Sequence, residues 1–537
     1  MNRANLFLLP QIIDQSADRF PDNLLFRFED TALTYATAVA QANQLAHMLA
    51  AQGVRRGDRV GIYLHKSLAS GVAIYGIMKA GAAYVPLDPT LPISRLTFVI
   101  RDCGIRHVIS ESSKLANLQE VATAVPHLQC VIGPKAPPNA PFRVISWQEV
   151  AQMPPSKPVV PGLMEDDLAY IMYTSGSTGD PKGMMHTHRS GLSYAKASAK
   201  LYDIQPSDIL GNHSPLHFDV STFDYFSGPL AGATTVIVPE EYKMLPASLS
   251  ELIQDERMTI WYSVVTALVE LLLRGALEHR NWTALRWVLY CGEPFPPKHL
   301  TALMATLPQA RFSNVYGPAE VNQCSYFHVP PLPNKYEDRY TPIGKVWDIA
   351  DWLVVDEQDE IVPSREAGEL LIAAPTRMQG YWNRSDLTEA GFYRQRPFPG
   401  SPYEKIFYRT GDLVQLDEDG EFKFLGRKDR QIKMRGYRVE LDEIEAAISS
   451  HEAVAETAVY TLPDGTGSQL IEAAVVFKAG TNTIMPELIN HASARLPVYA
   501  VPPSFVKLDS FPRTGSGKIN RRALQAAAQS REETAVE

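Results

Sequence analysis

Short, uninterrupted apolar runs alternate with longer amphipathic stretches from about residue 30 to 370, and this alternation constrains the fold most. Residues 60–64 and 168–173 are runs of the first kind, whereas 35–51 and 248–255 have the length and spacing of helices. A strand that is apolar at consecutive positions is buried on both faces, which is typical of a parallel sheet covered by helices. The sequence therefore predicts an α/β fold with a large N-terminal domain of parallel-rich sheets.

The rest of the chain has a different sequence pattern. Residues 343–425 combine shorter apolar runs with more turn residues, which predicts a β-rich subdomain. Between 439 and 448 apolar side chains recur at helical spacing, and a strand–helix–strand pattern runs on to about 510. These features predict a small α+β C-terminal domain. The proline-rich stretch 133–161 is expected to be a surface excursion.

The composition argues against several classes of protein. The 51 Lys and Arg against 60 Asp and Glu give a net charge of −9, which is unlike a general nucleic-acid binder with a basic face. The four cysteines are far apart and form no CxxC pair, so neither a disulfide framework nor a zinc site is expected. The N-terminus has only a short apolar run, and the apolar segment 260–273 is interrupted by polar residues. We therefore expect a cytoplasmic protein with no signal peptide and no membrane partner.

A glycine-rich loop follows the buried run 168–173 directly. Its sequence is Thr174-Ser-Gly-Ser-Thr-Gly-Asp-Pro-Lys-Gly183. Glycines let a backbone approach an anion closely, so that several N–H groups converge on phosphate oxygens, and Lys182 adds a positive charge. A flexible linker is the plain alternative, but a linker seldom begins at the end of an apolar strand. No GxxxxGK[ST] register fits, which disfavours an ordinary P-loop enzyme. The candidate phosphate-binding residues are Thr174, Ser175, Gly176, Ser177, Thr178, Gly179 and Lys182.

Five further motifs accompany this loop in a fixed order. They are Lys79-Ala-Gly-Ala-Ala-Tyr-Val-Pro-Leu-Asp88, Asn314-Val-Tyr-Gly-Pro-Ala-Glu320, Tyr408-Arg-Thr-Gly-Asp-Leu413, Gly426-Arg-Lys-Asp-Arg-Gln-Ile-Lys-Met-Arg-Gly436 and Pro512-Arg-Thr-Gly-Ser-Gly-Lys518. Together the six motifs resemble those of the adenylate-forming superfamily, which includes peptide-synthetase adenylation domains, acyl- and aryl-CoA synthetases, and luciferases. Six ordered motifs are far more specific than any one of them.

The resemblance implies the chemistry and the site. In this superfamily a carboxylate attacks the α-phosphorus of ATP with Mg²⁺ as cofactor, and a thiol then takes the acyl group from the acyl-adenylate. Charge builds on the departing pyrophosphate, so cations on the phosphates are needed. The implied catalytic residues are Lys518, Glu320 and Lys182, with Glu320 also holding the metal. Besides the phosphate-binding loop, the implied ATP- and AMP-binding residues are Gly292, Glu293, Asn314, Tyr316, Gly317, Asp412 and Arg427.

Several of these residues have a specific implied role. Tyr316 would stack on adenine, Asn314 would hydrogen-bond its amino group, and Asp412 would accept the ribose hydroxyls, with Arg427 close to the same sugar. Ala319 departs from the superfamily pattern, which usually has Thr there, so one hydroxyl donor is missing.

The C-terminal motifs imply a domain that moves. Lys518 would bridge the substrate carboxylate and the α-phosphate, although in isolation it would be read as a surface lysine in a turn. Asp429 matches the superfamily hinge, about which a small domain rotates between adenylation and thiol transfer. The implied domains are 1–428, which binds ATP and the amino acid, and 429–537, a mobile lid.

The segment His213-Ser-Pro-Leu-His-Phe-Asp-Val-Ser221 bears on the substrate. A metal cluster of His213, His217 and Asp219, or a hydroxyl nucleophile at Ser221, is conceivable but has no supporting ligand or base pattern. The segment instead resembles amino-acid-activating members, in which the Asp pairs with the substrate ammonium. The implied amino-acid-binding residues are Asp219, Val220, Phe223, Tyr262, Leu289, Cys291, Val315, Gln323 and Cys324. This compact apolar set resembles that of free-standing prolyl adenylation enzymes, so L-proline is the expected substrate, with another small apolar amino acid as the nearest alternative.

The acceptor is inferred from what the sequence lacks. Only 19 residues follow Lys518, and no Gly-Gly-x-Ser attachment site is present. We therefore expect transfer to a separate carrier protein with a phosphopantetheine thiol. The alternatives are a CoA ligase for a small carboxylic acid, which Asp219 argues against, and a non-catalytic nucleotide-binding protein, suggested only by Ala319.

Overall fold

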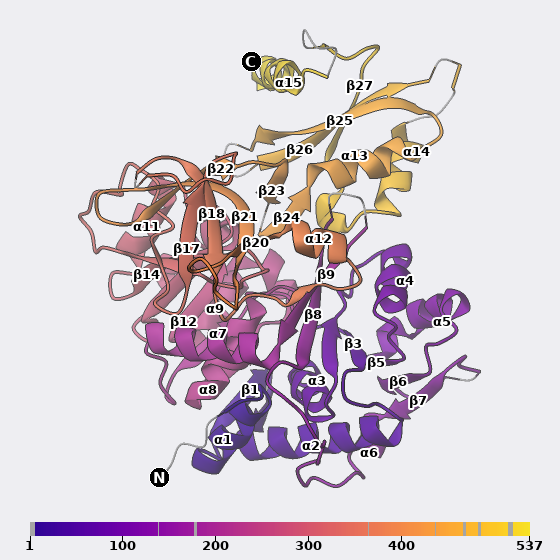
Figure 1. The fold of residues 1–537 in the computed structure, drawn as a ribbon. Coiled ribbons are helices and arrows are strands. Elements are labelled where there is room, and N and C mark those ends of the chain that lie inside the picture. Colours follow the sequence, from indigo (N-terminus) through magenta and orange to yellow (C-terminus); the bar gives the residue numbers. More distant parts are fainter. Residues whose placement is uncertain are drawn as a thin grey trace. The chain divides into compact units, whose positions relative to one another are not determined.

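The structure is a computed structural model that describes residues 6–137, 139–176, 180–363, 365–434, 436–464, 469–478, 480–481, 485–513 and 519–536 (Figure 1). The chain divides into two compact units. One unit comprises Met1–Pro89, Val99–Tyr173 and Gly183–Lys428, and the other comprises Thr90–Phe98, Thr174–Lys182 and Asp429–Glu537.

The larger unit contains a sheet that has nine strands within the described residues. Their order is β16 (Lys345–Val346), β15 (Ser325–Val329), β14 (Arg311–Tyr316), β13 (Trp287–Cys291), β12 (Ile260–Val264), β10 (Ile209–Asn212), β11 (Thr234–Ile237), β1 (Leu24–Phe28) and β2 (Thr31–Thr34). The run from β14 through β1 is parallel, and antiparallel strands flank it on both sides. This is the parallel-rich arrangement that the apolar runs predict.

A second sheet has eight strands in the described part of the chain. Their order is β19 (Gly380–Tyr381), β9 (Lys182–Thr187), β8 (Leu168–Thr174), β4 (Ala83–Pro86), β3 (Arg59–Tyr63), β5 (His107–Ser110), β6 (Cys130–Gly133) and β7 (Arg143–Ser146). The pairs from β8 through β7 are parallel. Strand β7 lies in the proline-rich stretch 133–161, so the prediction that this whole stretch is a surface excursion is wrong. The short run Arg143–Ser146 pairs with β6 despite the prolines around it.

Helices fill the space around both sheets. Up to residue 428 the helices are α1 (Gln11–Arg19), α2 (Tyr35–Ala51), α3 (Leu68–Lys79), α4 (Ile93–Asp102), α5 (Leu115–Ala124), α6 (Trp147–Val150), α7 (His188–Leu201), α8 (Gly228–Ala231), α9 (Pro246–Asp255), α10 (Val265–Arg274), α11 (Pro297–Thr306) and α12 (Ser385–Ala390). Helices α2 and α3 share one buried core with side chains from strands of both large sheets. A short π-helical turn, η2 (Phe223–Ser227), leads into α8.

A third sheet forms the β-rich part of the larger unit. It contains β17 (Asp351–Val355), β18 (Gly368–Ala373), β21 (Lys405–Leu416) and β20 (Phe392–Gln395), and β22 (Phe422–Arg427) also pairs with β21. All of its pairings are antiparallel. The larger unit therefore combines two parallel-rich sheets with a β-rich subdomain, and the predicted fold class is confirmed.

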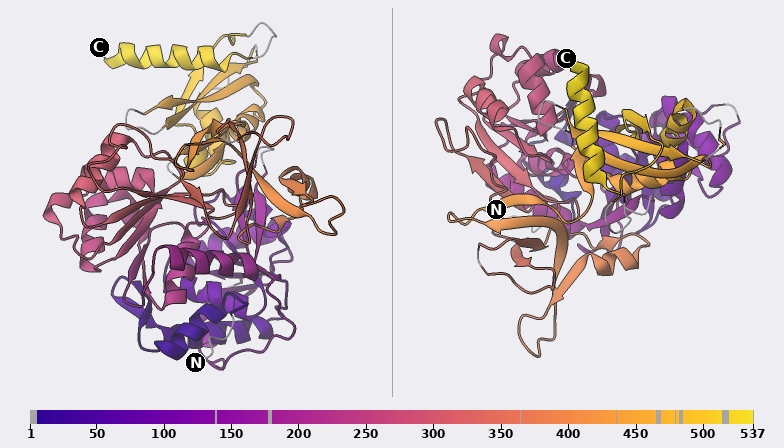
Figure 2. Two further views of the ribbon diagram at one scale, coloured as in Figure 1. Left: turned by 60° about the vertical axis from the view of Figure 1, so that its left-hand side comes forward. Right: turned by 90° about the horizontal axis from the view of Figure 1, so that it is seen from above.

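The smaller unit is α+β. Strands β25 (Val454–Pro463), β26 (Gln469–Phe477) and β27 (Ser504–Lys507) form a sheet next to the hairpin of β23 (Gln431–Met434) and β24 (Tyr437–Glu440), with helices α13 (Leu441–Ser449), α14 (Met485–Ser493) and α15 (Arg521–Val536). Successive side chains of a strand point to opposite faces. Accordingly, Val459 belongs to the core under α13, whereas Tyr460 packs with Leu524 of α15. Figure 2 shows α15, in yellow, lying across these strands.

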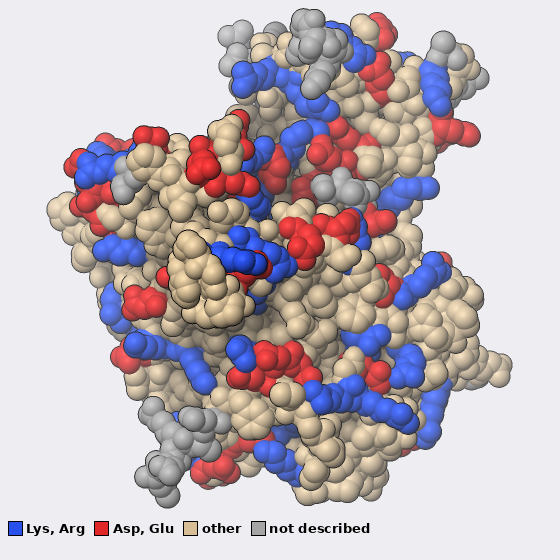
Figure 3. Space-filling view, viewed as in Figure 1, with Lys and Arg blue, Asp and Glu red and all other residues tan. Residues whose placement is uncertain are grey.

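Acidic and basic side chains are interspersed over the face of the molecule shown in Figure 3. This mixture agrees with the modest net charge of −9. Among the described residues, every helix is too short or too polar to cross a bilayer.

Candidate functional site

The glycine-rich loop connects two neighbouring strands of the second sheet. Strand β8 ends at Thr174 and β9 begins at Lys182. A side chain at Gly176 would place its Cβ 2.2 Å from the carbonyl oxygen of Asp180, so the backbone there requires glycine. Ser177, Thr178 and Gly179 lie outside the described residues.

The start and the end of this loop are tied together. The Tyr173 hydroxyl donates to the carboxylate of Asp102, which ends α4. The backbone carbonyl of Asp102 accepts from the indole Nε1 of Trp382 at 2.9 Å. The backbone N–H of Trp382 donates to the Gly183 carbonyl at 2.7 Å. A Cβ at Gly183 would lie 2.9 Å from the Tyr173 ring, so the Tyr173 ring packs directly on the backbone of Gly183. We call Asp102, Tyr173, Gly183 and Trp382 the loop clamp. Sequence reasoning missed the contributions of Asp102 and Trp382, because they are far from the loop in the chain.

Three of the implied nucleotide-binding residues meet where β14 faces the third sheet. The hydroxyl of Tyr316, the last residue of β14, donates to the carboxylate of Asp412 on β21. Arg427 pairs in register with Asp412 and donates to its Oδ1 at 2.6 Å. Burial, with the negative charge of Asp412, raises the pKa of the Tyr316 hydroxyl, which therefore stays a donor. These two donors fix the orientation of the Asp412 carboxylate.

Asn314 lies two residues before Tyr316 on the same strand. Its Nδ2 donates to the carbonyl of Pro342 at 2.8 Å and to the Thr341 hydroxyl at 3.3 Å. Since its donor group is engaged in this way, its amide oxygen is the group it can offer to a base. Gly317 approaches the backbone so closely that a Cβ there would lie 1.8 Å from the Asn322 carbonyl oxygen.

Gly292 and Glu293 follow the neighbouring strand β13. Gly292 has φ +91°, a left-handed conformation that favours glycine. The Glu293 carboxylate accepts from the Thr266 hydroxyl at 2.7 Å. Both residues thus lie on the turn at the carboxyl end of a parallel strand, the usual edge for ligand binding in such sheets.

Glu320 is completely buried, and its carboxylate accepts a hydrogen bond from the Tyr381 hydroxyl at 2.6 Å. The preceding carbonyl, that of Ala319, contacts Nε2 of His186 at 3.1 Å. Burial lowers the pKa of His186 to about 4, so at neutral pH this ring is uncharged and Nε2–H donates to the carbonyl. Tyr381 was not found from the sequence, because a lone Tyr 61 residues away in the chain carries no signal.

The segment that carries Asp219 folds as a series of turns. Hydrogen bonds run from Ser221 to the Phe218 carbonyl, from Thr222 to that of Asp219 and from Phe223 to that of Val220, at 2.9–3.1 Å. The Ser221 hydroxyl is buried and donates to the Phe218 carbonyl at 2.6 Å. This engagement argues against Ser221 as a nucleophile.

The alternative of a metal cluster at His213, His217 and Asp219 also lacks support. Among the described residues, the grouping of carboxylate, imidazole and thiol side chains that is tight enough for one ion consists of Asp417, Asp419 and Glu421, on a β-hairpin of the third sheet. Burial lowers the pKa of both His213 and His217.

Most of the implied amino-acid-binding side chains share one apolar cluster. In adjacent parallel strands Tyr262 is in register with Leu289, and Cys291 is in register with Val315. Because Leu289 and Cys291 are two positions apart, all four side chains project from one face of the sheet. Phe223 packs edge-on against Tyr262, with ring centroids 5.4 Å apart. The cluster brings together Val220, Phe223, Tyr262, Leu289, Cys291 and Val315.

The last two members of the implied set differ in their surroundings. The Nε2 of Gln323 donates to the hydroxyl of Tyr202, a member of the same cluster, at 3.1 Å. Cys324 is buried in the core that contains Tyr316 instead. The apolar members of the implied amino-acid-binding set therefore share one cluster, with the exception of Cys324.

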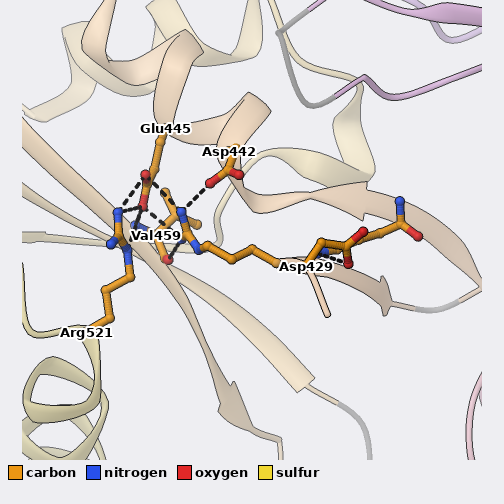
Figure 4. Close-up of polar contacts among 7 residues, drawn as sticks. Asp429, Asp442, Glu445, Val459 and Arg521 are labelled. Carbon is orange, nitrogen blue, oxygen red and sulfur yellow. Dashed lines mark hydrogen bonds and ion pairs between the residues drawn. The ribbon is translucent and has the colours of Figure 1, made fainter. Parts of the chain in front are cut away.

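Asp429 is the first residue after the larger unit, and the residue that follows it is held firmly in the smaller unit (Figure 4). Arg430 donates to Glu445 at 2.9 Å and to the Val459 carbonyl at 2.6 Å, and it also bonds Asp442. Arg521 of α15 donates to the same Glu445 at 2.9 Å. The chain thus joins the core of the smaller unit within one residue of Asp429. Lys518 lies outside the described residues.

Comparison with known proteins identifies the family. The model of the AMP-binding enzyme family matches residues 13–382, and that of the AMP-binding enzyme C-terminal domain matches 443–518. An L-proline–[L-prolyl-carrier protein] ligase of Pseudomonas fluorescens is 32% identical over 96% of this chain and 98% of its own length. A ligase of the same name from Streptomyces coelicolor is 34% identical over 92% and 91%.

A solved structure has the same fold. The amide bond synthetase McbA of Marinactinospora thermotolerans superimposes with a TM-score of 0.84 at 23% identity, covering 96% of this chain and 99% of McbA. The two family models together account for most of the chain, including the glycine-rich loop and the strand that carries Asn314 and Tyr316. The chain belongs to the AMP-binding enzyme family.

Proposed function

We propose that this protein activates L-proline with ATP to prolyl-AMP and transfers the prolyl group to the phosphopantetheine thiol of a separate carrier protein. The observation that carries the proposal is the end-to-end similarity to two L-proline–[L-prolyl-carrier protein] ligases, of which the chain covers 98% and 91%. Both are matched almost whole rather than as one module of a larger synthetase.

The amino-acid site supports a small apolar side chain next to an ammonium group. The edge-on pair of Phe223 and Tyr262 narrows the cluster, and Leu289 and Val315 complete an apolar surface. Asp219 begins the turn that delivers Val220 and Phe223 to that cluster. A carboxylate at this point would pair with the secondary ammonium of proline, whereas a simple carboxylic acid would leave it without a cation.

The nucleotide site supports ATP. We assign Asp412 to the ribose hydroxyls, since its carboxylate is oriented by Tyr316 and Arg427. Asn314 would accept the adenine amino group through its amide oxygen. In this assignment the Tyr316 ring lies beside the base.

Glu320 is the residue that would hold Mg²⁺. Carboxylate oxygens are the hard donors this ion prefers, and one carboxylate is enough when phosphates and water complete its shell. The ion would supply positive charge to the phosphates as pyrophosphate leaves. The buried hydrogen bond from Tyr381 fixes the Glu320 side chain in one orientation.

Lys518 is proposed to neutralise charge between the substrate carboxylate and the α-phosphate, and Lys182 to contact the outer phosphates. We predict that Lys518→Ala abolishes prolyl-AMP formation but leaves thioester formation from supplied prolyl-AMP largely intact. The two half-reactions can be measured separately by pyrophosphate exchange and by mass spectrometry of the carrier. Equal loss of both would contradict the assignment.

The function is tested by amino-acid-dependent exchange of labelled pyrophosphate into ATP, with a panel of amino acids and simple carboxylic acids. We expect the highest kcat/KM with L-proline, and transfer to a holo carrier protein but not to its apo form. Exchange with a simple acid and CoA transfer would instead indicate a CoA ligase. Binding of ATP without exchange for any acid would indicate a non-catalytic protein.

A further inference from the structure

The segment that carries Asp219, Val220 and Phe223 is closed at its base by a buried polar contact. Asn212, the last residue of β10, directly precedes the segment, and Asp224 directly follows it. The Nδ2 of Asn212 donates to Oδ2 of Asp224 at 3.0 Å. Both side chains are almost completely inaccessible to solvent. The residues between them therefore form a loop whose two ends meet, a shape typical of compact functional loops.

A buried lysine from a distant part of the chain contacts the beginning of this loop. Lys66 lies between β3 and α3, and its Nζ donates to the carbonyls of Asn212 and His213 at 2.7 and 3.0 Å. Its exposed fraction is only 4%. Because β3 and β10 belong to different sheets, this ammonium group ties the loop to the second sheet.

Keeping a lysine at this depth is unfavourable for folding. Burial, reinforced by the charge of Lys243, lowers the pKa of Lys66 to about 7. Burial also raises the pKa of Asp224 to about 8, partly opposed by the hydrogen bond from Asn212 and the charge of Lys66. The negative charge of Glu240 acts in the opposite direction and raises the pKa of Lys66. An apolar side chain at this position would avoid the desolvation cost. The evidence for a role of Lys66 is therefore its hydrogen bonds to the carbonyls of Asn212 and His213.

We propose that Lys66 is a positioning residue for amino-acid selection, which holds the loop 213–223 in the conformation that presents Asp219 to the substrate ammonium. The inference rests on the proposed function of Asp219 and adds a residue that none of the sequence motifs contains. Lys66 acts through the backbone carbonyls of Asn212 and His213.

The test compares two buried lysines. Lys66→Met keeps the length of the side chain and removes the donors. Lys79→Met is the matched control, since Lys79 is also buried but is paired with Asp14 on α1. In pyrophosphate exchange we expect Lys66→Met to raise the KM for the amino acid about tenfold and to leave the KM for ATP unchanged. Lys79→Met should change neither KM, and Lys66→Arg, which keeps the donors, should recover part of the loss.

A second measurement does not depend on catalysis. Amide hydrogen exchange of peptides that cover 213–223 should become faster in Lys66→Met than in the wild type, with peptides of β14 unchanged. If the wild type exchanges no pyrophosphate with any amino acid, the proposed function fails, while this measurement still decides whether Lys66 holds the loop. An unchanged amino-acid KM in folded Lys66→Met, or unchanged protection of 213–223, would overturn the inference.

Discussion

Ala319 is the residue at which this chain departs from the superfamily pattern, and the departure can be reversed. Its carbonyl contacts His186 Nε2, and the carbonyl of the next residue, Glu320, accepts from the Met378 N–H at 2.7 Å, so the backbone at this position is held on both sides. We predict that Ala319→Thr raises the rate of pyrophosphate exchange by about fivefold, because a hydroxyl donor to the phosphate region contributes about 1 kcal/mol.

The control is Ala319→Val, which adds similar volume without the hydroxyl. A rate increase in both variants would show that packing, and not hydrogen bonding, limits this position. No increase in Ala319→Thr would show that another group already supplies the donor.

Cys291 offers a chemical probe of the proposed amino-acid site. It is partly exposed, whereas Cys103, Cys130 and Cys324 are buried. Burial raises the pKa of Cys103 to about 12 and that of Cys130 to about 11, so these thiols form little of the reactive thiolate.

We therefore predict that iodoacetamide labels Cys291 first and inactivates the enzyme, and that L-proline slows both events. Peptide mapping by mass spectrometry locates the label, and Cys291→Ala should lose the fast phase of labelling. Labelling that L-proline does not slow would place Cys291 away from the substrate.

At the scale of single elements, the loop clamp links α4, β8, β9 and the segment around β19. The Tyr173 hydroxyl supplies one bond of this clamp, while its ring packs on Gly183. We predict that Tyr173→Phe, which keeps the ring and removes the bond to Asp102, raises the KM for ATP about fivefold, since a net loss of about 1 kcal/mol is expected for one buried hydrogen bond. The amino-acid KM should stay the same.

Tyr35→Phe is the matched control, because the Tyr35 hydroxyl also makes a buried hydrogen bond, to the Ala233 carbonyl at 2.7 Å, away from the loop. A similar rise in the KM for ATP in both variants would show a general loss of rigidity instead of a role for the clamp.

The elements also show what the sequence could and could not predict. Consecutive apolar residues identified β8 and β13, and amphipathic spacing identified α2 with its observed bounds, because burial pattern is local information. The apolar spacing assigns Val439 to the helix that follows, but Val439 lies in β24. Its two-residue offset from Leu441 fits the period of a strand, whereas the helical spacing of three and four residues begins only at Leu441. The motifs named Asp412, yet its pairing with Tyr316 depends on a contact between two sheets, which no local pattern encodes.

At the scale of the whole molecule, the larger unit contains several buried histidines that oppose folding in acid. Burial lowers the pKa of His186 and of His188 to about 4, and it lowers that of His107 and His213 as well. In the unfolded chain these side chains regain a pKa near 6.5. As the pH falls from 6.5 towards 4, the unfolded chain binds protons that the folded unit excludes, so the free energy of unfolding decreases.

We predict that the melting temperature of the larger unit falls markedly between pH 7.5 and pH 5, with each of His186 and His188 costing about 2 kcal/mol at pH 5. His188→Asn should show a smaller fall than the wild type, because it removes one protonation site that only the unfolded chain can use. His279→Asn is the control, since that side chain is 75% exposed and its removal should leave the pH dependence unchanged. Differential scanning calorimetry at the two pH values measures the difference. An equal fall in the wild type and in His188→Asn would show that carboxylate protonation, rather than the buried histidines, dominates acid unfolding.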